Sequence, residues 1–278
     1  LSKNRKRIRI NKFPKKFTNK NSDLIKKKLS FTLTNDQEKV LDEINQDLLS
    51  DKRMFRIIQG DVGSGKTIVS LLSILNVIKS GYQCALMSPT EILAKQHYTL
   101  IKKIFKNENF DIEFLTGKTE YKLRKVILAN LTSGKIKILI GTHALFQKKI
   151  NFRKLGLVVI DEQHKFGVKQ RSDLAKKGGD ECDVLLMSAT PIPRTMMLSL
   201  YGDMDISKIT EKPAKRKNIN TLSKPENKIN ELWPFIQKQI LELLESGSPL
   251  IASERIKFLI SDIENGLLNE TPREGAST

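Results

Sequence analysis

Residues 55–78 read FRIIQGDVGSGKTIVSLLSILNVI. The stretch opens with FRII, a short run typical of a strand, and continues from Thr67 as an apolar helical pattern. Between the two, Gly60–Thr67 match the phosphate-loop template G-x-x-x-x-G-K-[S/T] at every position. Glycines let the backbone turn successive N–H groups toward a phosphate, and the helix that follows presents its positive end. The stretch therefore predicts an α/β fold with a phosphate-binding loop at the end of a strand.

Two side chains of this loop carry distinct chemistry. Lys66 is expected to pair with the β- and γ-phosphates of a nucleotide, and the hydroxyl of Thr67 is expected to hold Mg²⁺. The residues expected to surround the nucleotide are Gly60, Asp61, Gly63, Ser64, Gly65, Lys66 and Thr67. A chance match in a glycine-rich turn is the alternative, and the agreement of strand, loop and helix argues against it.

Short apolar or β-branched runs alternate with helical patterns along the rest of the chain. The expected strands are Phe55–Ile58, Ala85–Met87, Ile112–Leu115, Ile136–Ile140, Leu157–Ile160 and Val184–Met187. Strands that read as continuous apolar runs are usually buried on both faces. The alternation therefore predicts a parallel, doubly wound sheet flanked by helices. A capped amphipathic helix is expected to begin at Thr34 or Asn35, because an apolar helical period follows there.

A pair of carboxylates follows one of these strands, in LGLVVIDEQH. Asp161 comes directly after four apolar residues, where it could complete a Mg²⁺ site with the phosphate loop. Glu162 comes next and could accept a proton from an attacking water molecule. Two solvated acids at a strand end are common, so this interpretation depends on the phosphate loop being present as well.

The charge balance favours a polyanionic partner. The 278 residues include 49 Lys+Arg and 31 Asp+Glu, which gives a net charge of +18 at pH 7. Residues 1–30 hold 12 basic side chains against the single acid Asp23, and so contribute +11 of that total. An excess of this size is expected of a protein that meets nucleic acid. A lysine-rich bias arising from an AT-rich coding sequence is the alternative.

Composition also excludes several classes of protein. With 39% hydrophobic and 29% charged residues, 15 Gly and 9 Pro, the chain is neither collagen-like nor largely disordered. No apolar stretch approaches the roughly 20 residues of a membrane span, and no secretory signal is recognisable. Cys84 and Cys182 each lie inside an apolar run and are expected to be reduced core thiols. These features predict a cytoplasmic protein without membrane association.

Six strings, taken together, resemble the superfamily 2 helicases and, more narrowly, their RecG family. The strings are GDVGSGKT (60–67), SPTEILAKQH (88–97), LTG (115–117), GTHALFQ (141–147), DEQHKFGVKQR (161–171) and SATPIPRTMMLSLYGDMDIS (188–207). Transcription-repair coupling factors share ATPIPRT but are similar to DEEH and GDVGFGKT where this chain has Gln163 and Ser64. Those two positions favour the RecG family, and a coupling-factor-like DNA translocase is the alternative.

The resemblance implies a RecA-like P-loop NTPase that uses ATP and Mg²⁺. It further implies an ATP-dependent DNA helicase, working as a monomer on branched or forked duplex DNA. Branch migration and the processing of stalled forks, in DNA recombination and repair, are the implied tasks.

The resemblance also assigns roles to individual residues. Gln37, in FTLTNDQ, matches the residue that reads the adenine edge, with a solvated glutamine at a helix start as the alternative. The residues matched to coupling between nucleotide state and DNA movement are Gln163, His164, Ser188 and Thr190. The residues matched to contact with DNA are Thr90, Glu91, Thr142, His143, Arg171 and Arg194. Without the family, the strand-tip residues read as ordinary helix caps and His164 as a core histidine, and His97 reads as structural.

Departures from the family pattern set the expected domain organisation. No glycine-arginine pair is present that could supply the arginine finger of a second motor domain. We therefore expect a basic linker from a missing upstream wedge domain at 1–30, the first RecA-like domain at 31–215, and a linker with a truncated or aberrant start of the second domain at 216–278. Two other interpretations stay open: a nucleotide-binding module that is inactive in isolation, and a nucleic-acid-binding fragment that depends on its basic N-terminal tail.

Overall fold

The computed structural model describes residues 11–18, 20–147, 149–162, 179, 182–190, 204–211, 234 and 238. The chain divides into two units, 1–216 and 217–278, and the helices and strands described below all belong to the first. The expected domain boundaries at residues 30 and 215 stay predictions.

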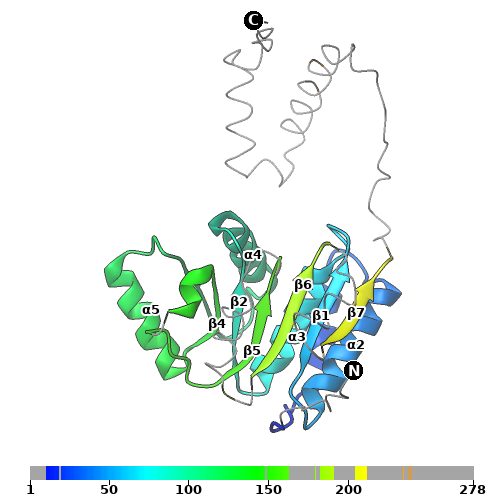
Figure 1. Ribbon diagram of the computed structural model, residues 1–278, viewed down its shortest axis with the longest axis horizontal. Coiled ribbons are helices and arrows are strands. Elements are labelled where there is room, and N and C mark those ends of the chain that lie inside the picture. The colour runs from blue at the N-terminus through cyan, green and yellow to red at the C-terminus, as the bar shows by residue number, and fades with distance from the viewer. Residues whose placement is uncertain are drawn as a thin grey trace, which may run out of the picture. The chain divides into compact units, whose positions relative to one another are not determined.

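Seven parallel strands form a single sheet (Figure 1). The strands are β1 (Phe55–Gly60), β2 (Gln83–Met87), β3 (Asp111–Leu115), β4 (Ile136–Gly141), β5 (Leu155–Ile160), β6 (Asp183–Ser188) and β7 (Asp205–Ile209). Their order across the sheet is β3-β4-β2-β5-β6-β1-β7, and every pairing is parallel. The predicted parallel α/β sheet is confirmed, and all six expected strands are present.

Helices cover both faces of the sheet. They are α1 (Lys20–Lys28), α2 (Asn35–Leu49), α3 (Lys66–Lys79), α4 (Glu91–Ile104), α5 (Tyr121–Ser133) and the 3₁₀ helix η1 (His143–Phe146). One apolar core joins α2, α3 and α4 to one face, and a second core joins α5 to the other. Successive strand residues alternate between the cores, as Ile57 and Ile58 do, which is why these strands read as continuous apolar runs.

Local sequence explains where two of the helices begin. Thr34 caps α2, because its hydroxyl accepts a hydrogen bond from the Gln37 N–H while the Gln37 side chain accepts one from the Thr34 N–H. Gly65 precedes α3 with φ of 90°, a left-handed conformation that glycine adopts without strain. No helix in the described part of the chain is long and apolar enough to cross a membrane.

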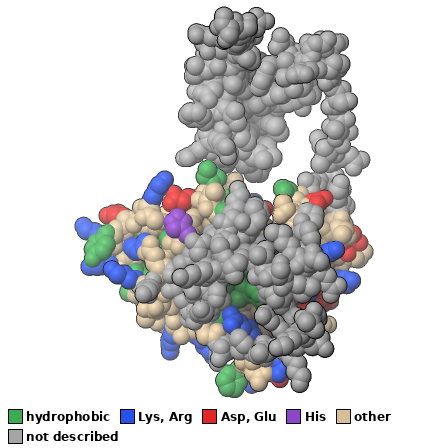
Figure 2. All heavy atoms as spheres, viewed as in Figure 1, with side chains coloured by type: hydrophobic (Ala, Val, Ile, Leu, Met, Phe, Trp, Pro, Cys, Tyr) green, Lys and Arg blue, Asp and Glu red, His purple; other side chains and the backbone are tan. Residues whose placement is uncertain are grey.

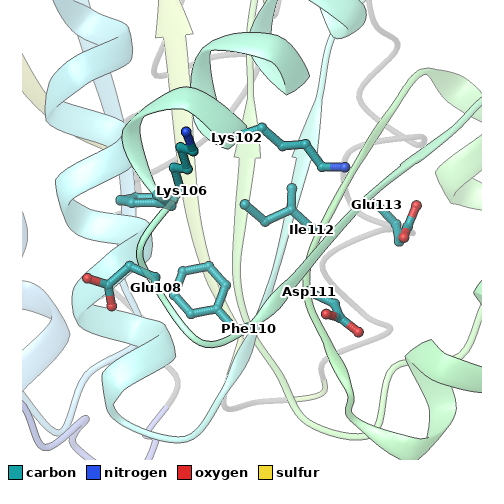
Figure 3. Close-up of a pocket in the computed structure, with 8 residues that line it drawn as sticks. Lys102, Lys106, Glu108, Phe110, Asp111, Ile112 and Glu113 are labelled. Carbon is teal, nitrogen blue, oxygen red and sulfur yellow. The ribbon is translucent and has the colours of Figure 1, made fainter.

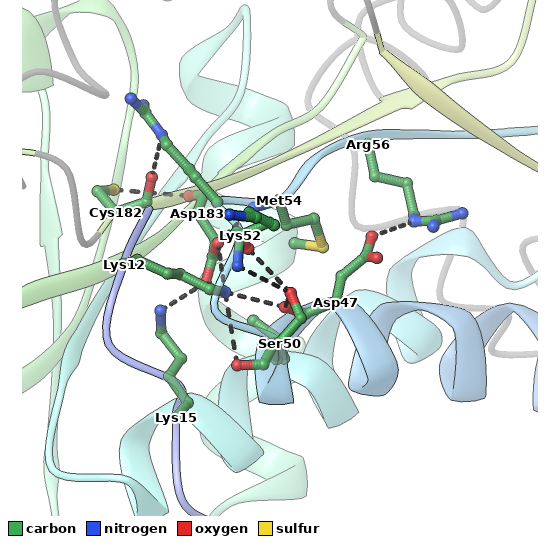
Figure 4. A network of polar contacts seen from close by, with 11 residues as sticks. Lys12, Lys15, Asp47, Ser50, Lys52, Met54, Arg56, Cys182 and Asp183 are labelled. Carbon is green, nitrogen blue, oxygen red and sulfur yellow. Dashed lines mark hydrogen bonds and ion pairs between the residues drawn. The ribbon is translucent and has the colours of Figure 1, made fainter. Parts of the chain in front are cut away.

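The basic N-terminal segment is tied to the sheet by a buried charge cluster (Figure 4). Lys12 Nζ lies 2.8 Å from both carboxylate oxygens of Asp183, the first residue of β6, and Lys15 Nζ bonds the same carboxylate. Asp183 Oδ1 also accepts a hydrogen bond from the Met54 N–H at 2.7 Å. All three charged side chains are fully buried. Burial lowers the pKa of Lys12, and the Asp183 carboxylate opposes that effect.

The two cysteines lie in the core, as expected. Cys84, on β2, and Cys182, just before β6, are both buried with free thiols. Burial raises the pKa of both, that of Cys182 to about 12, so neither thiol is ionised near neutral pH.

Candidate active site

The candidate site lies along one edge of the sheet. Because all seven strands run in the same direction, their carboxyl ends meet at this edge (Figure 1). The phosphate loop follows β1, Ser88 to Thr90 follow β2, Thr142 follows β4, and Asp161 follows β5. Sheet order places β6 between β5 and β1. Segments that are separated by about a hundred residues in the sequence are therefore neighbours here.

The phosphate loop is closely packed and depends on its glycines. Gly63 and Gly65 have φ of 78° and 90°. A side chain at Gly60 would bring its Cβ within 2.6 Å of Ser64 Oγ and 2.7 Å of the Ile209 carbonyl oxygen. The backbone of the loop therefore depends on glycine at these positions, as the phosphate-loop template requires.

Lys66 lies at the first turn of α3 and is buried. Its Nζ donates hydrogen bonds to the carbonyl oxygens of Gly60, at 2.6 Å, and Asp61, at 2.9 Å. Burial lowers the pKa of Lys66, and the negative charges of Asp161, Glu162 and Asp61 oppose that shift. The ammonium group is thus held inside the loop and within electrostatic range of both carboxylates of DEQH.

Asp161 is held on two sides. Its Oδ1 accepts a hydrogen bond from the Glu162 N–H at 3.0 Å, and its Oδ2 lies 2.8 Å from His97 Nε2. Its backbone N–H donates to the Met87 carbonyl oxygen at 2.8 Å, which extends the register of β5 with β2. The sequence predicts only a structural role for His97. Its position on the buried stripe of α4, with Ala94 and Ile101, indicates burial but does not name its partner.

Glu162 has an unusual backbone conformation. Its φ is 48°, which makes it the only non-glycine residue with positive φ among those described. A side chain in this region costs about 1–3 kcal/mol, and such strain is concentrated at functional sites.

Gln37 joins α2 to the phosphate loop. Its Oε1 accepts from the Thr34 N–H at 3.0 Å, and its Nε2 donates to the Ser64 carbonyl oxygen at 2.7 Å. The side chain is buried, so the alternative of a solvated helix-start glutamine is wrong. One lone pair of the oxygen and one N–H of the amide stay available, which is what pairing with an adenine edge requires.

Replacing Gln37 with Ala should reduce the preference for ATP over GTP. The change removes the amide that faces the loop and also opens the capping box, which costs about 1 kcal/mol of stability. Competition between the two nucleotides measures the preference, and urea unfolding measures the stability. Gln46→Ala, at an exposed position of the same helix, is the matched control. An unchanged ATP-to-GTP ratio in Gln37→Ala would contradict the role in reading adenine.

The hydroxyls of the SAT string contact each other at the end of β6. Ser188 Oγ lies 3.0 Å from the Thr190 carbonyl oxygen and 3.1 Å from Thr190 Oγ1. Ser188 is buried and Thr190 is exposed. Since β6 lies between β5 and β1, this pair is placed between Asp161 and the phosphate loop. The structure thus brings these two expected coupling residues next to the residues expected to bind nucleotide.

The residues expected to contact DNA have different environments. Thr90 caps α4, its hydroxyl accepting from the Leu93 N–H, and Glu91 pairs with Lys118 of the loop after β3 at 3.4 Å. The Thr142 hydroxyl is buried and has no partner among the residues that the structure describes, whereas His143 is exposed. The helix-cap interpretation is thus correct for Thr90 as local structure, and contact with DNA stays a prediction for all four expected residues. The remaining predicted residues, Gln163, His164, Arg171 and Arg194, lie outside the described residues.

The oxygen donors at the site fit Mg²⁺. This cation prefers hard oxygen ligands and keeps several waters and phosphate oxygens of its own, so one or two protein ligands suffice. Thr67, in the first turn of α3, and Asp161, after β5, offer a hydroxyl and a carboxylate. Ser64 Oγ, within the loop, is buried and has no hydrogen-bond partner among the described residues, so it is available to a bound group.

A separate cavity of about 290 Å³ lies between the end of α4 and β3 (Figure 3). The residues that line it are Lys102, Phe105, Lys106, Glu108, Phe110, Asp111, Ile112 and Glu113. None of them belongs to the phosphate loop or to DEQH. The cavity is at the opposite end of α4 from Thr90, so it is not the nucleotide site.

Charges on the described surface are mixed. On the face shown in Figure 2, Lys and Arg side chains are spread around the molecule with Asp and Glu side chains among them. Lys12 and Lys15 lie in the interior, where both pair with the single carboxylate of Asp183. The overall excess of positive charge therefore does not form one continuous patch in the part of this face that is described.

Comparison with known proteins reveals a clear family relationship. The DEAD/DEAH box helicase family model matches residues 34–198. The chain is 46% identical over 228 residues to the ATP-dependent DNA helicase RecG of Thermotoga maritima, an alignment that covers 82% of this chain and 29% of that protein. It is 43% identical over 265 residues to RecG of Bacillus subtilis, covering 91% of this chain and 39% of that protein. The chain thus spans about a third of the length of these relatives.

A solved structure supports the same relationship. RecG bound to a three-way DNA junction superposes with a TM-score of 0.73 at 36% sequence identity, covering 92% of this chain and 38% of that one. The resemblance drawn from the six sequence strings is confirmed, and so is the fold class.

Proposed function

Because the chain belongs to the DEAD/DEAH box helicase family, we propose that it is the nucleotide-binding motor portion of an ATP-dependent DNA helicase of the RecG type. The observation that carries the proposal is the meeting of Lys66, Asp161 and Glu162 at one edge of the sheet. The three are close enough for both carboxylates to influence the pKa of the lysine.

The proposed reaction is in-line attack of water on the γ-phosphorus of ATP. A bond forms from the water oxygen to phosphorus, the bond to the bridging oxygen of ADP breaks, and the water proton passes to the Glu162 carboxylate. Lys66 neutralises charge on the β- and γ-phosphates, and Thr67 and Asp161 would hold Mg²⁺. When bound, the cation supplies further positive charge to the phosphate oxygens. The phosphate loop and the N-terminus of α3 orient the nucleotide.

The proposed substrate is branched or forked duplex DNA, with branch migration and stalled-fork processing as the task. Thr90, Glu91, Thr142 and His143 follow strand ends at the same edge as the nucleotide site, so DNA bound there would be near the hydrolysis machinery. Arg171 and Arg194 are proposed to contribute as well. The similar structure of RecG with a three-way DNA junction supports this class of substrate. A cytoplasmic monomer is the proposed form.

Residues 31–215 are the proposed first RecA-like domain, with a linker at 1–30 and the start of a second domain at 216–278. Part of the proposed linker nevertheless packs on the motor domain, since Lys12 and Lys15 are buried against Asp183 and α1 contacts α3. Those two lysines are not available to bind DNA phosphates. This weakens the alternative in which the basic N-terminal tail alone supplies the binding.

Replacing Glu162 with Gln should leave ATP binding within about twofold of the wild type and lower hydrolysis by about 10²–10⁴-fold, because the base is lost and the charge of one carboxylate removed. Hydrolysis is measured by phosphate release with and without forked DNA, and binding by titration with a fluorescent ATP analogue. Glu120→Gln, exposed at the start of α5, is the matched control.

Either of two results would contradict the proposal. Loss of nucleotide binding in Glu162→Gln as large as in a Lys66 variant would contradict the division of roles. Equal affinity for forked and linear duplexes of the same length would show that charge alone drives DNA binding. If wild-type turnover is no faster than that of Glu162→Gln while binding persists, the isolated chain is a nucleotide-binding module without activity of its own.

A further inference from the structure

Helix α4 carries one ionisable side chain on its buried face. The buried residues of this helix are Ala94, His97 and Ile101, spaced so that they face the sheet together. His97 is only 8% exposed, and its Nε2 lies 2.8 Å from Asp161 Oδ2. An ionised carboxylate only accepts hydrogen bonds, so Nε2 is the donor in this contact.

The contact determines how the Asp161 carboxylate is turned. Oδ1 is occupied by the Glu162 N–H, and Oδ2 by His97. A carboxylate offers about four lone-pair sites, so each oxygen keeps one for another partner. With both oxygens bonded, rotation about the Cβ–Cγ bond is restricted, and the remaining lone pairs have a defined direction.

Neighbouring polar side chains do not share this task. Ser88 follows Met87, which pairs with Ile160 on one side and Gly141 on the other. Ser88, Asp161 and Thr142 therefore occupy one row across three strands. The Ser88 and Thr142 hydroxyls are both buried and have no hydrogen-bond partner in the described part of the chain, so neither bonds Asp161. Within the described residues, His97 is the side chain that does.

We propose that His97 is a positioning residue that orients Asp161 toward Mg²⁺ and so sets the preference of the site for metal-bound over metal-free nucleotide. The proposal rests on the proposed function, in which Asp161 holds the cation. Hydrogen bonds to a metal-ligating carboxylate tune metal affinity without contacting the metal, and losing such a partner typically costs 10–100-fold in affinity.

The test compares nucleotide affinity with Mg²⁺ and with EDTA, using a fluorescent ATP analogue and the 278-residue chain. His97→Leu fills the space but cannot donate, and His97→Asn is polar but too short to reach Oδ2. His97→Gln places an amide N–H near the position of Nε2. The matched control is Gln96→Leu, at an exposed neighbouring position.

We expect His97→Leu and His97→Asn to lower the affinity gain due to Mg²⁺ by 10–100-fold, with affinity in EDTA unchanged. His97→Gln should keep the gain within about threefold of wild type. Urea unfolding checks that each variant is folded. If His97→Leu does not fold, the comparison uses His97→Asn instead.

Three results would overturn the proposal: an unchanged Mg²⁺ gain in both His97→Leu and His97→Asn, a Gln variant as defective as Leu, or an equal loss with and without Mg²⁺, which indicates a purely structural role. A wild-type chain that binds no nucleotide would instead contradict the proposed function, and the positioning role with it.

Discussion

Replacing Lys66 with Ala should weaken ATP binding by at least about thirtyfold. Truncating one partner of a buried, hydrogen-bonded charge pair costs about 2–5 kcal/mol, and each 1.4 kcal/mol is a factor of ten. The buried Lys66 ammonium lies at the head of α3, where the phosphates are expected, and no other lysine belongs to the loop. Titration with a fluorescent ATP analogue measures the loss.

The comparison needs variants that separate phosphate binding from loop structure. Lys66 also bonds the carbonyl oxygens of Gly60 and Asp61, so its removal could loosen the loop itself. Lys66→Met keeps the bulk of the side chain and should lose as much affinity as Lys66→Ala. Lys79→Ala, at the far end of α3, should leave affinity unchanged and should cost no more than about 1 kcal/mol of stability, because Lys79 lies at the surface and pairs with a Glu108 carboxylate that is only partly buried. Wild-type affinity in Lys66→Met would rule out an electrostatic role.

Replacing Asp183 with Ala should lower the free energy of unfolding by about 3–5 kcal/mol. The change leaves Lys12 and Lys15 buried without a counter-charge and removes the acceptor for the Met54 N–H. Breaking a buried ion pair by removing one partner has a cost of this size, much larger than that of a surface pair. Urea unfolding followed by circular dichroism measures the difference.

Replacing the whole cluster with uncharged residues tests whether unpaired buried charge causes the loss of stability. The triple variant Lys12→Met, Lys15→Met and Asp183→Asn keeps an acceptor for Met54 while removing all three charges, and it should recover most of the lost stability. Asp51→Ala, which removes an exposed carboxylate paired with Lys52 at 3.6 Å, should cost less than about 1 kcal/mol. If Asp183→Ala and Asp51→Ala cost the same, the buried cluster does not contribute as described.

Sequence periodicity predicted six of the seven strands and missed β7, the last strand on one side of the sheet. Continuous apolar runs such as Leu157–Ile160 mark strands that are covered on both faces, and these were all predicted. β7, with the sequence DISKI, has only five residues, of which only Ser207 and Ile209 are buried. So short a pattern does not stand out from loop sequence.

The phosphate loop and the two acids could be predicted because their chemistry requires fixed residue types at fixed spacing. The side chains that contact these residues from distant parts of the chain could not be predicted. Nothing in the sequence pairs His97 with Asp161, 64 residues away, or Lys12 with Asp183, 171 residues away. From its sequence, a basic N-terminal segment is expected to be exposed to solvent. Only the folded structure shows that two of its lysines are buried and paired with a distant carboxylate.

The anchoring of the N-terminal segment also has a mechanical consequence. The same strand, β6, receives Lys12 and Lys15 at its first residue and ends at Ser188, between Asp161 and the phosphate loop. It is hydrogen-bonded to strands on both sides, so it is stiff along its length of roughly 20 Å. We expect a displacement of residues 12–15 to be transmitted along β6 to Ser188, because this strand connects the two places as one hydrogen-bonded element.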